Sequence, residues 1–252
     1  MAIECADVII GYETYLNIIT PLLEGKEVIS SGMMQEIERC SQAIEMASEG
    51  RVVALVSGGD PGIYGMAGLV FEILSAEEGK SISSEEKDKN FRPQTSELQN
   101  FRTSELFVEV IPGIAALNAA ASRLGAPLMH DFASISLSDL LTPWDVIVKR
   151  LEASAASNFV IVLYNPKSKK RTEQIKIAHE IISKYRNPET PVGIVRHATK
   201  PEEEIVITTL GQMLKHKIDM QSIIIIGNSQ TFIWKNWMVT PRGYGNKFKI
   251  AG

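Results

Sequence analysis

Cysteine is scarce in this sequence, and its scarcity limits the kind of fold that the chain can build. Only Cys5 and Cys40 occur among 252 residues. Two cysteines cannot form the disulfide framework of a small secreted domain, so we expect a protein of the reducing cytosol. We expect no signal peptide and a cytoplasmic location.

Histidines and long apolar runs are also few. The four histidines, at positions 130, 179, 197 and 216, lack the spacing of metal ligands, so we expect no metal site. No apolar run approaches the roughly 20 residues that a membrane-spanning helix needs. We therefore expect no membrane partner.

A basic excess is missing as well. The net charge is −4, and the densest basic cluster is formed by Lys167, Lys169, Lys170 and Arg171. Proteins that bind nucleic acid usually carry a basic face, so we do not expect a nucleic-acid partner. A small anionic substrate remains compatible with the composition, because a few local cations suffice to bind it.

The chain alternates short β-branched runs with amphipathic segments, a pattern typical of an α/β fold. Because the runs are apolar throughout, we expect sheets that are covered on both faces. The expected strands are 52–57, 106–111, 159–164, 192–195, 205–209 and 223–226. The expected helices cover 37–47, 66–74, 114–124 and 175–185, and another begins with Thr142 as N-cap and Pro143 as first helical residue.

Two features indicate how the chain is organised. The stretch 75–104 is rich in Glu, Lys, Ser, Asn and Gln, and we interpret it as a mobile surface insertion, with partner binding as the alternative. Gly125-Ala126-Pro127 closes the first half, and a new α/β run starts after Ser136. We therefore predict two α/β domains, 1–132 and 133–252.

Two glycine-rich stretches each follow an expected strand and precede an expected helix: SGGDPGIYG (57–65) and IPGIAA (111–116). Glycine lets the backbone turn sharply and approach a ligand, and ligands of open α/β sheets bind at the carboxyl ends of strands. Asp60 could bind a ligand there, but a plain strand-to-helix turn is an equal alternative. Ala115 and Ala116 leave room for a flat ligand, and tight helix packing is their alternative.

Polar side chains follow two expected strands of the second half. Asn165 lies in LYNPKS (163–168), where it could cap a helix or bind a ligand. Lys167 and Arg196 could pair with carboxylates, arginine through two parallel hydrogen bonds. Solvation at the surface is the alternative for both cations.

These stretches together resemble the tetrapyrrole methylase family, also called class III methyltransferases dependent on S-adenosylmethionine (SAM). The motifs SGGDPGIYG, VIPGIAALNAA, LYNPKSKKR and IIIGNSQT occur in the order that the family shows. Within the family, GAPLMHDFASISLSDLLTPW (125–144) and GIVRHATKPEE (193–203) are most similar to the precorrin-3B C17-methyltransferase branch. The resemblance implies two α/β domains with an active-site cleft between them, and a homodimer.

The resemblance also implies a reaction and its residues. The protein would methylate C17 of precorrin-3B, or of its cobalt complex, with ring contraction, in cobalamin biosynthesis. His130 is a candidate acid or base for contraction and Asp131 would orient it; an inactive role at the domain junction is the alternative. The residues implied for SAM are Gly58, Gly59, Asp60, Ile63, Ala115, Ala116, Asn165 and Ala198, and the candidates for the substrate's carboxylates are Arg123, Lys167, Arg196 and Arg242.

The start of the chain departs from the family. MAIECADVIIGYETY reads as the end of a helix followed by a strand, so a first strand, loop and helix of roughly 20 residues are missing. Either the true start lies upstream or the chain is a truncated copy. Two other functions therefore stay open: a family member that acts on another acceptor, and a non-catalytic protein that binds SAM or a tetrapyrrole.

Overall fold

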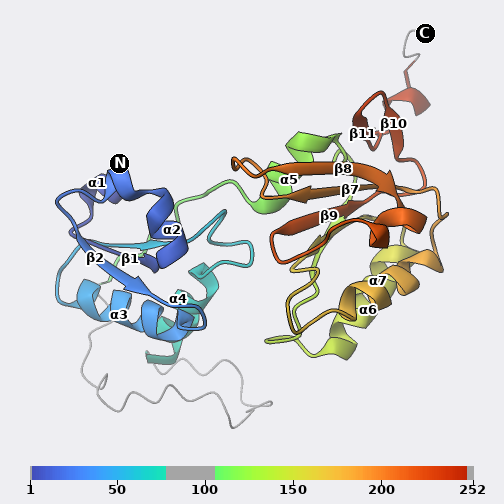
Figure 1. Cartoon of the computed structure of the whole chain (residues 1–252). Helices are drawn as coiled ribbons and strands as arrows, with labels where there is room; N and C mark the ends of the chain where they lie inside the picture. Colours follow the sequence, from blue (N-terminus) through green and yellow to red (C-terminus); the bar gives the residue numbers. More distant parts are fainter. Residues whose placement is uncertain (1, 78–105, 249–252) are drawn as a thin grey trace. The chain divides into compact units, whose positions relative to one another are not determined.

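The computed structural model describes residues 2–77 and 106–248 (Figure 1). Nearly all of the predicted insertion lies outside these residues. The chain divides into two compact units, Met1–Ala115 and Ala116–Gly252. The sequence placed this boundary at 132/133. The structural division comes earlier because helix α5 (Ala116–Leu124) packs on the sheet of the second unit.

The first unit is built on three parallel strands in the order β2-β1-β3. Side chains of the central strand alternate between the two faces of this sheet, as the period of a strand requires. Ile9 packs with Leu16 on one face, and Ile10 packs with Ala43 on the other. The strands are β1 (Val8–Tyr12), β2 (Glu27–Ser31) and β3 (Val53–Val56).

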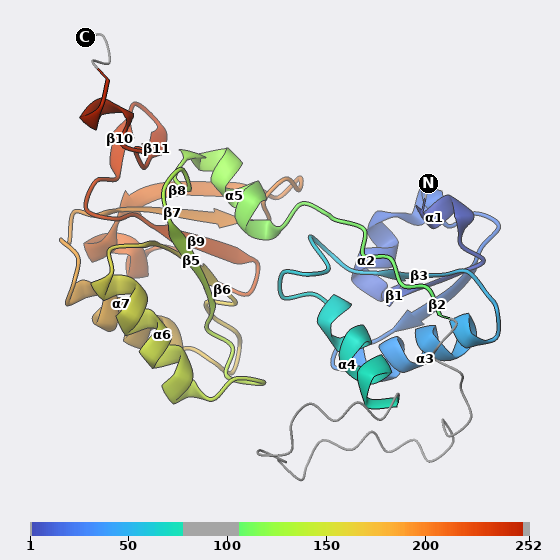
Figure 2. The same ribbon diagram turned by 180° about the vertical axis from the view of Figure 1, so that it is seen from behind.

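Helices cover both faces of this sheet (Figures 1 and 2). The short elements α1 (Ala2–Cys5), α2 (Glu13–Ile18) and η1 (Thr20–Leu22) lie on one side. On the other side α3 (Glu36–Ser48) packs against α4 (Ala67–Glu77). Gly50 follows α3 with φ of 89°, which confirms the glycine stop expected there.

The segment 106–111 is not a strand, so that prediction is wrong. Phe107 is 87% exposed and Val110 is 43% exposed. Among the described residues, β3 pairs with β1 alone. A β-branched run favours an extended backbone, but a strand also needs a neighbour for its hydrogen bonds, and sequence composition does not supply one.

The second unit contains a five-stranded sheet in the order β5-β6-β9-β7-β8. Strands β5, β6 and β7 run in one direction, and β8 and β9 run in the opposite direction. All the strands expected between 159 and 226 are confirmed, whereas β5 was not predicted. The bounds are β5 (Phe132–Ser136), β6 (Val160–Tyr164), β7 (Pro191–Arg196), β8 (Glu204–Thr209) and β9 (Ser222–Ile226).

Helices α6 (Trp144–Ala156) and α7 (Gln174–Ser183) cover one face of this sheet, together with η3 (Leu210–Lys215). Figure 2 shows α5 on the opposite face. Gly193 permits that contact, because a Cβ there would lie 2.2 Å from Cδ1 of Leu124. Pro143, not Thr142, is the N-cap of α6, so the predicted start was one residue early.

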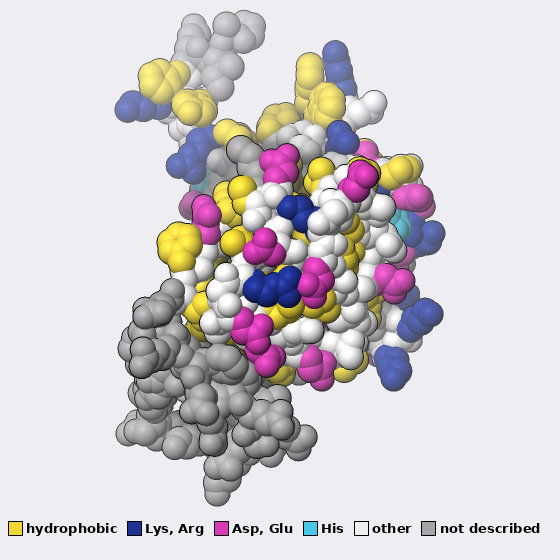
Figure 3. All heavy atoms as spheres, turned by 90° about the vertical axis from the view of Figure 1, so that its left-hand side faces the viewer, with side chains coloured by type: hydrophobic (Ala, Val, Ile, Leu, Met, Phe, Trp, Pro, Cys, Tyr) yellow, Lys and Arg dark blue, Asp and Glu magenta, His cyan; other side chains and the backbone are white. Residues whose placement is uncertain are grey.

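A small sheet completes the second unit. The hairpin β10 (Phe232–Trp234) and β11 (Trp237–Val239) pairs with β4 (Gly125–Ala126), and η4 (Tyr244–Asn246) follows. No described helix is long and apolar enough to cross a membrane. On the face shown in Figure 3, acidic and basic side chains are interspersed.

Candidate functional site

In the first unit, the predicted glycine loop leaves the carboxyl edge of the sheet. Strands β1, β2 and β3 are parallel, so their carboxyl ends share that edge. The loop 57–65 follows β3 directly. Gly59 has φ of 78° and Tyr64 has φ of 55°, so the backbone is left-handed at both positions. Such conformations are costly for a residue with a side chain and cluster at functional sites.

Asp60 joins the two predicted glycine turns. Its Oδ1 accepts a hydrogen bond from the Gly62 amide at 2.8 Å, and its Oδ2 accepts one from the Gly113 amide at 3.0 Å. A Cβ at Gly113 would lie 2.0 Å from the carbonyl oxygen of Gly59, so the two turns touch backbone to backbone. The prediction that these turns lie side by side is confirmed, although the strand at 106–111 on which it rested does not form.

A tyrosine missed by the sequence analysis supports the same loop. A Cβ at Gly58 would lie 2.6 Å from Cε1 of Tyr15. The Tyr15 ring in turn meets Tyr12 edge to face, with ring centroids 5.4 Å apart. Ile63 is 40% exposed, which leaves its side chain available to a ligand. The ring of Tyr15 therefore limits the space beneath the loop to what a glycine can occupy.

In the second unit, Asn165 lies directly after β6 at the carboxyl edge of the parallel strands. Its φ of 47° is left-handed, and its Nδ2 donates to Oγ of Ser136 at 3.0 Å. The preceding Tyr164 accepts a hydrogen bond at Oη from the Leu117 amide at 2.8 Å. This buried contact holds the start of α5, and so Ala116, beside the end of β6.

The turn that contains Ala198 is held by a carboxylate. His197 and Thr199, on either side of it, have φ of 49° and 65°. Glu203 accepts hydrogen bonds from the Thr199 amide at 2.5 Å and from Nε of Arg123 at 2.9 Å. These two donors lower the pKa of Glu203 below its usual value, against the smaller opposing effect of burial. Arg123, a predicted substrate cation, thus pairs with a carboxylate of the chain itself.

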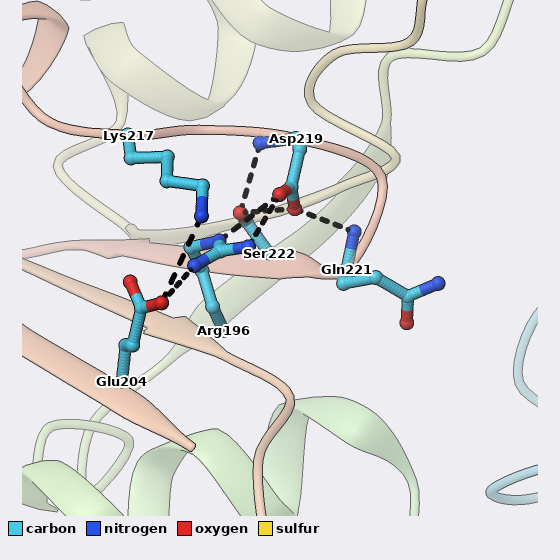
Figure 4. A network of polar contacts seen from close by, with 6 residues as sticks. All are labelled: Arg196, Glu204, Lys217, Asp219, Gln221 and Ser222. Atoms are coloured by element: carbon cyan, nitrogen blue, oxygen red, sulfur yellow. Dashed lines mark hydrogen bonds and ion pairs between the residues drawn. The ribbon is translucent and has the colours of Figure 1, made fainter. Parts of the chain in front are cut away.

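Arg196 is also engaged within the protein (Figure 4). Its Nε and Nη2 donate to Oδ2 of Asp219 at 3.0 and 2.7 Å, and its Nη1 lies 2.5 Å from Oε1 of Glu204. Only 7% of the side chain is exposed. We therefore correct the prediction that Arg196 binds a substrate carboxylate. It joins the end of β7 to the starts of β8 and β9.

His130 and Asp131 lie at the opposite edge of the second sheet. They precede β5, and the Val160 amide at the start of β6 donates to the carbonyl of Asp131. At about 3.3 Å per residue, the five residues of β5 separate this edge from Asn165 by roughly 17 Å. Arg242 lines the same open pocket of about 560 Å³ as His130 and Asp131.

Two further observations concern Lys167, the remaining candidate for the substrate's carboxylates, and the possibility of a metal site. Lys167 is half-buried and forms no ion pair among the described residues, although its charge contributes to lowering the pKa of Glu173. The described residues contain no group of three or more His, Cys, Asp or Glu that could hold a metal ion.

Comparison with known proteins places these features in a family. The sequence model of the tetrapyrrole (corrin/porphyrin) methylases matches residues 1–82 and 91–214. The cobalt-factor III methyltransferase of Priestia megaterium is 46% identical over 99% of the chain, which covers 42% of that protein. The probable cobalt-factor III C(17)-methyltransferase of Salmonella typhimurium is 44% identical over 96% of the chain, which covers 90% of that protein. The crystal structure of the methyltransferase CobJ superimposes with a TM-score of 0.80 at 33% identity, over 95% of this chain and 90% of that one.

Proposed function

Because the chain belongs to the tetrapyrrole methylase family, we propose that it transfers a methyl group from SAM to C17 of precorrin-3B or its cobalt complex, with ring contraction. The structural observation that carries this proposal is the contact of Asp60 with the Gly113 amide, which assembles two glycine turns into one unit. The name of the Salmonella typhimurium relative supports the choice of C17, and the names of both relatives, which specify cobalt-factor III, support a cobalt-containing acceptor.

The residues of the two turns suit SAM, which is a bulky methyl donor with a flat purine base. Glycine at 113 lets the two turns meet backbone to backbone, and Gly59 adopts a left-handed conformation, so the backbone of the loop is open to close approach by a ligand. The amide oxygen of Asn165 has no partner among the described residues and can accept a hydrogen bond. We propose Gly58, Gly59, Asp60, Ile63, Ala115, Ala116, Asn165 and Ala198 as the residues that hold SAM.

Asp60 acts in this scheme as a scaffold. Both of its carboxylate oxygens accept hydrogen bonds from backbone amides, so the side chain fixes the shape of the turns. Charge-assisted hydrogen bonds of this kind are stronger than neutral ones. The negative charge also favours a cationic ligand near the loop.

The reaction does not require a strong nucleophile from the protein. SAM supplies a methyl on a sulfonium centre, which is already electrophilic, and the acceptor is an electron-rich ring carbon. The chain's contribution is to align the reactants and to exclude water; alignment alone can contribute about 7–11 kcal/mol in favourable cases. Rigid turns with left-handed residues such as Gly59 and Asn165 are suited to that task.

In the decisive experiment, the purified protein is incubated with SAM and with either metal-free precorrin-3B or its cobalt complex. A mass gain of one methyl in the pigment, with the product fragment that marks methylation at C17, supports the proposal. A heat-treated sample and a sample without SAM are the controls. No mass gain with either pigment would overturn the proposal.

A non-catalytic role is the second candidate, since the chain covers less than half of its Priestia megaterium relative. SAM binding by calorimetry without methyl transfer to either pigment would favour that role. We further propose a cytoplasmic homodimer, on the family resemblance, and light scattering of the purified protein tests the dimer.

A further inference from the structure

The loop after β6 contains an arginine whose charge has no partner. Arg171 donates from Nη2 to the carbonyl oxygen of Asn165 at 2.6 Å and from Nη1 to Oγ of Ser138 at 3.2 Å. Both acceptors are neutral. No carboxylate among the described residues lies within ion-pairing distance of this guanidinium. Its Nε is buried and has no acceptor there either.

Arg186 of the second unit is also without a carboxylate partner among the described residues, but it is buried and donates to the carbonyls of Ala155 and Phe159. It lies at the start of β6, away from the edge that carries Asn165. The other arginines near that edge are paired. Arg196 pairs with Asp219 and Glu204, and Arg123 pairs with Glu203. A partly buried cation is stabilised when an anion pairs with it, because the protein interior screens charge weakly. Arg171 therefore has the donors and the unbalanced charge for a carboxylate, and guanidinium suits one through two parallel hydrogen bonds.

The surroundings of Arg171 combine this charge with apolar surface. Nη2 contacts Sδ of Met220 at 3.7 Å, and Met220 is 46% exposed. Directly after Ser138 and Asp139, the chain presents Leu140 and Leu141, which are 69% and 93% exposed. The two segments that contact the guanidinium through Ser138 and Met220 thus carry exposed apolar side chains, which suits a ligand with an apolar body and carboxylates at its rim.

We propose that Arg171 binds a side-chain carboxylate of the tetrapyrrole and, through the same guanidinium, holds Asn165 in its left-handed conformation. This inference rests on the proposed function. Lys167, half-buried in the same loop, adds a second positive charge on that side. The carboxylate contact thus falls to Arg171 at the edge that carries Asn165, and Arg196 has only a structural role.

The test compares Arg171→Gln with Lys170→Gln in the full chain. Lys170 is exposed in the same loop, so its variant loses the same charge without the contacts. We expect Arg171→Gln to raise the KM for the pigment about tenfold or more, and the Kd for SAM by a smaller factor of about twofold to threefold, because Asn165 loses one of its contacts. The KM for the pigment of Lys170→Gln should equal that of the wild type. Arg171→Lys keeps the positive charge but loses the two parallel N–H donors, so its KM should lie between those of the wild type and Arg171→Gln.

A pigment whose side-chain carboxylates are methyl esters sharpens the test. Wild type should bind this ester more weakly than the acid, and the loss on esterification should be about tenfold smaller in Arg171→Gln, because the variant already lacks one of the carboxylate contacts. An unchanged KM for the pigment in Arg171→Gln would overturn the proposal. A Kd for SAM that rose as much as the KM for the pigment would also overturn it, because Arg171 would then act only by positioning Asn165. If Arg171→Gln does not fold, Arg171→Lys and the ester decide.

Failure of the proposed function gives a different result. Wild type would then bind the pigment, followed by its visible spectrum, without adding a methyl group. The comparison of pigment binding between wild type and Arg171→Gln would still decide the role of Arg171.

Discussion

The carboxylate of Asp60 and the amide of Gly113 lie 3.0 Å apart although 53 positions separate them in the chain. The contact forms without the strand that was expected to place Gly113 beside the first loop. Backbone proximity explains why, since a Cβ at Gly113 would overlap the carbonyl of Gly59. The meeting of the two turns depends on the absence of a side chain more than on sheet pairing.

Replacing Gly113 with alanine should therefore separate the turns. The added Cβ would lie 2.0 Å from a backbone oxygen, which cannot rotate away as a side chain can. We expect a loss of stability of about 1–3 kcal/mol in urea unfolding, typical of overpacking, and loss of measurable SAM binding by calorimetry.

Gly68→Ala is the matched control for that change. Gly68 lies in α4, and a Cβ there would meet nothing within 4 Å. Alanine favours a helix over glycine, so this variant should be more stable by about 0.5–1 kcal/mol and should bind SAM normally. If Gly113→Ala behaved like Gly68→Ala, the two turns would not need their close contact.

Much of the fold followed from the periodicity of the sequence. The strands after 159 and the helices α3, α4, α5 and α7 were predicted because long periodic segments specify their own type. Strand β2 (EVISS) was missed because its polar ends hide the pattern. The segment 106–111 shows the opposite error, since its composition favours a strand that the structure does not pair.

Pairing between charges was not predictable from the sequence. Arg196 and Arg123 each find a carboxylate at least 8 positions away, and no local pattern announces those partners. Arg171 was noticed only as part of a basic cluster, because its contacts with Asn165 and Ser138 depend on the fold. Sequence motifs identified the loops at the site, but which cations remain free is a property of tertiary structure.

Glu203 gives a prediction for the turn that carries Ala198. Gln at this position keeps one acceptor but loses the charge that holds the Thr199 amide and Arg123. We expect Glu203→Gln to raise the KM for SAM several-fold, roughly threefold to tenfold, with a smaller change in kcat. Initial rates at varied SAM measure both constants.

The neighbouring Glu202 supplies the control. It is exposed in the same turn, so Glu202→Gln removes the same charge from the same region and should leave the KM for SAM unchanged. Equal effects of the two substitutions would mean that net charge, and not the anchoring of the turn, controls binding.

Asp219 gives a prediction for the dependence of stability on pH. Burial raises the pKa of Asp219, but the hydrogen bonds from Arg196, the Gln221 amide and Ser222 outweigh it, so the pKa lies below its ordinary value. A lowered pKa in the folded state adds stability above the unfolded pKa of about 3.9, and this is lost as the pH falls through the folded value. Asp219→Asn should thus cost about 1–2 kcal/mol at pH 7 and progressively less below pH ~4.

Urea unfolding at several pH values measures that difference. Lys217→Ala is the control, because Lys217 is exposed and lies 3.8 Å from Glu204, and exposed pairs contribute at most about 1 kcal/mol. A cost for Asp219→Asn that stayed constant down to pH 3 would show that the pair with Arg196 does not stabilise the fold through charge.

The position of His130 gives the last prediction. As the acid or base of ring contraction, it would have to reach the reacting ring carbons. Its side chain instead lies before β5, at the edge of the sheet opposite Asn165, and its Nδ1 accepts a hydrogen bond from the Asp131 amide at 2.8 Å. We therefore expect His130→Ala to methylate and contract the pigment at rates within about twofold of wild type, since direct proton transfer needs hydrogen-bond reach. Methylated pigment that had not contracted, identified by its spectrum and mass, would instead assign His130 to the chemistry and would require a proton path from the amino edge of the sheet.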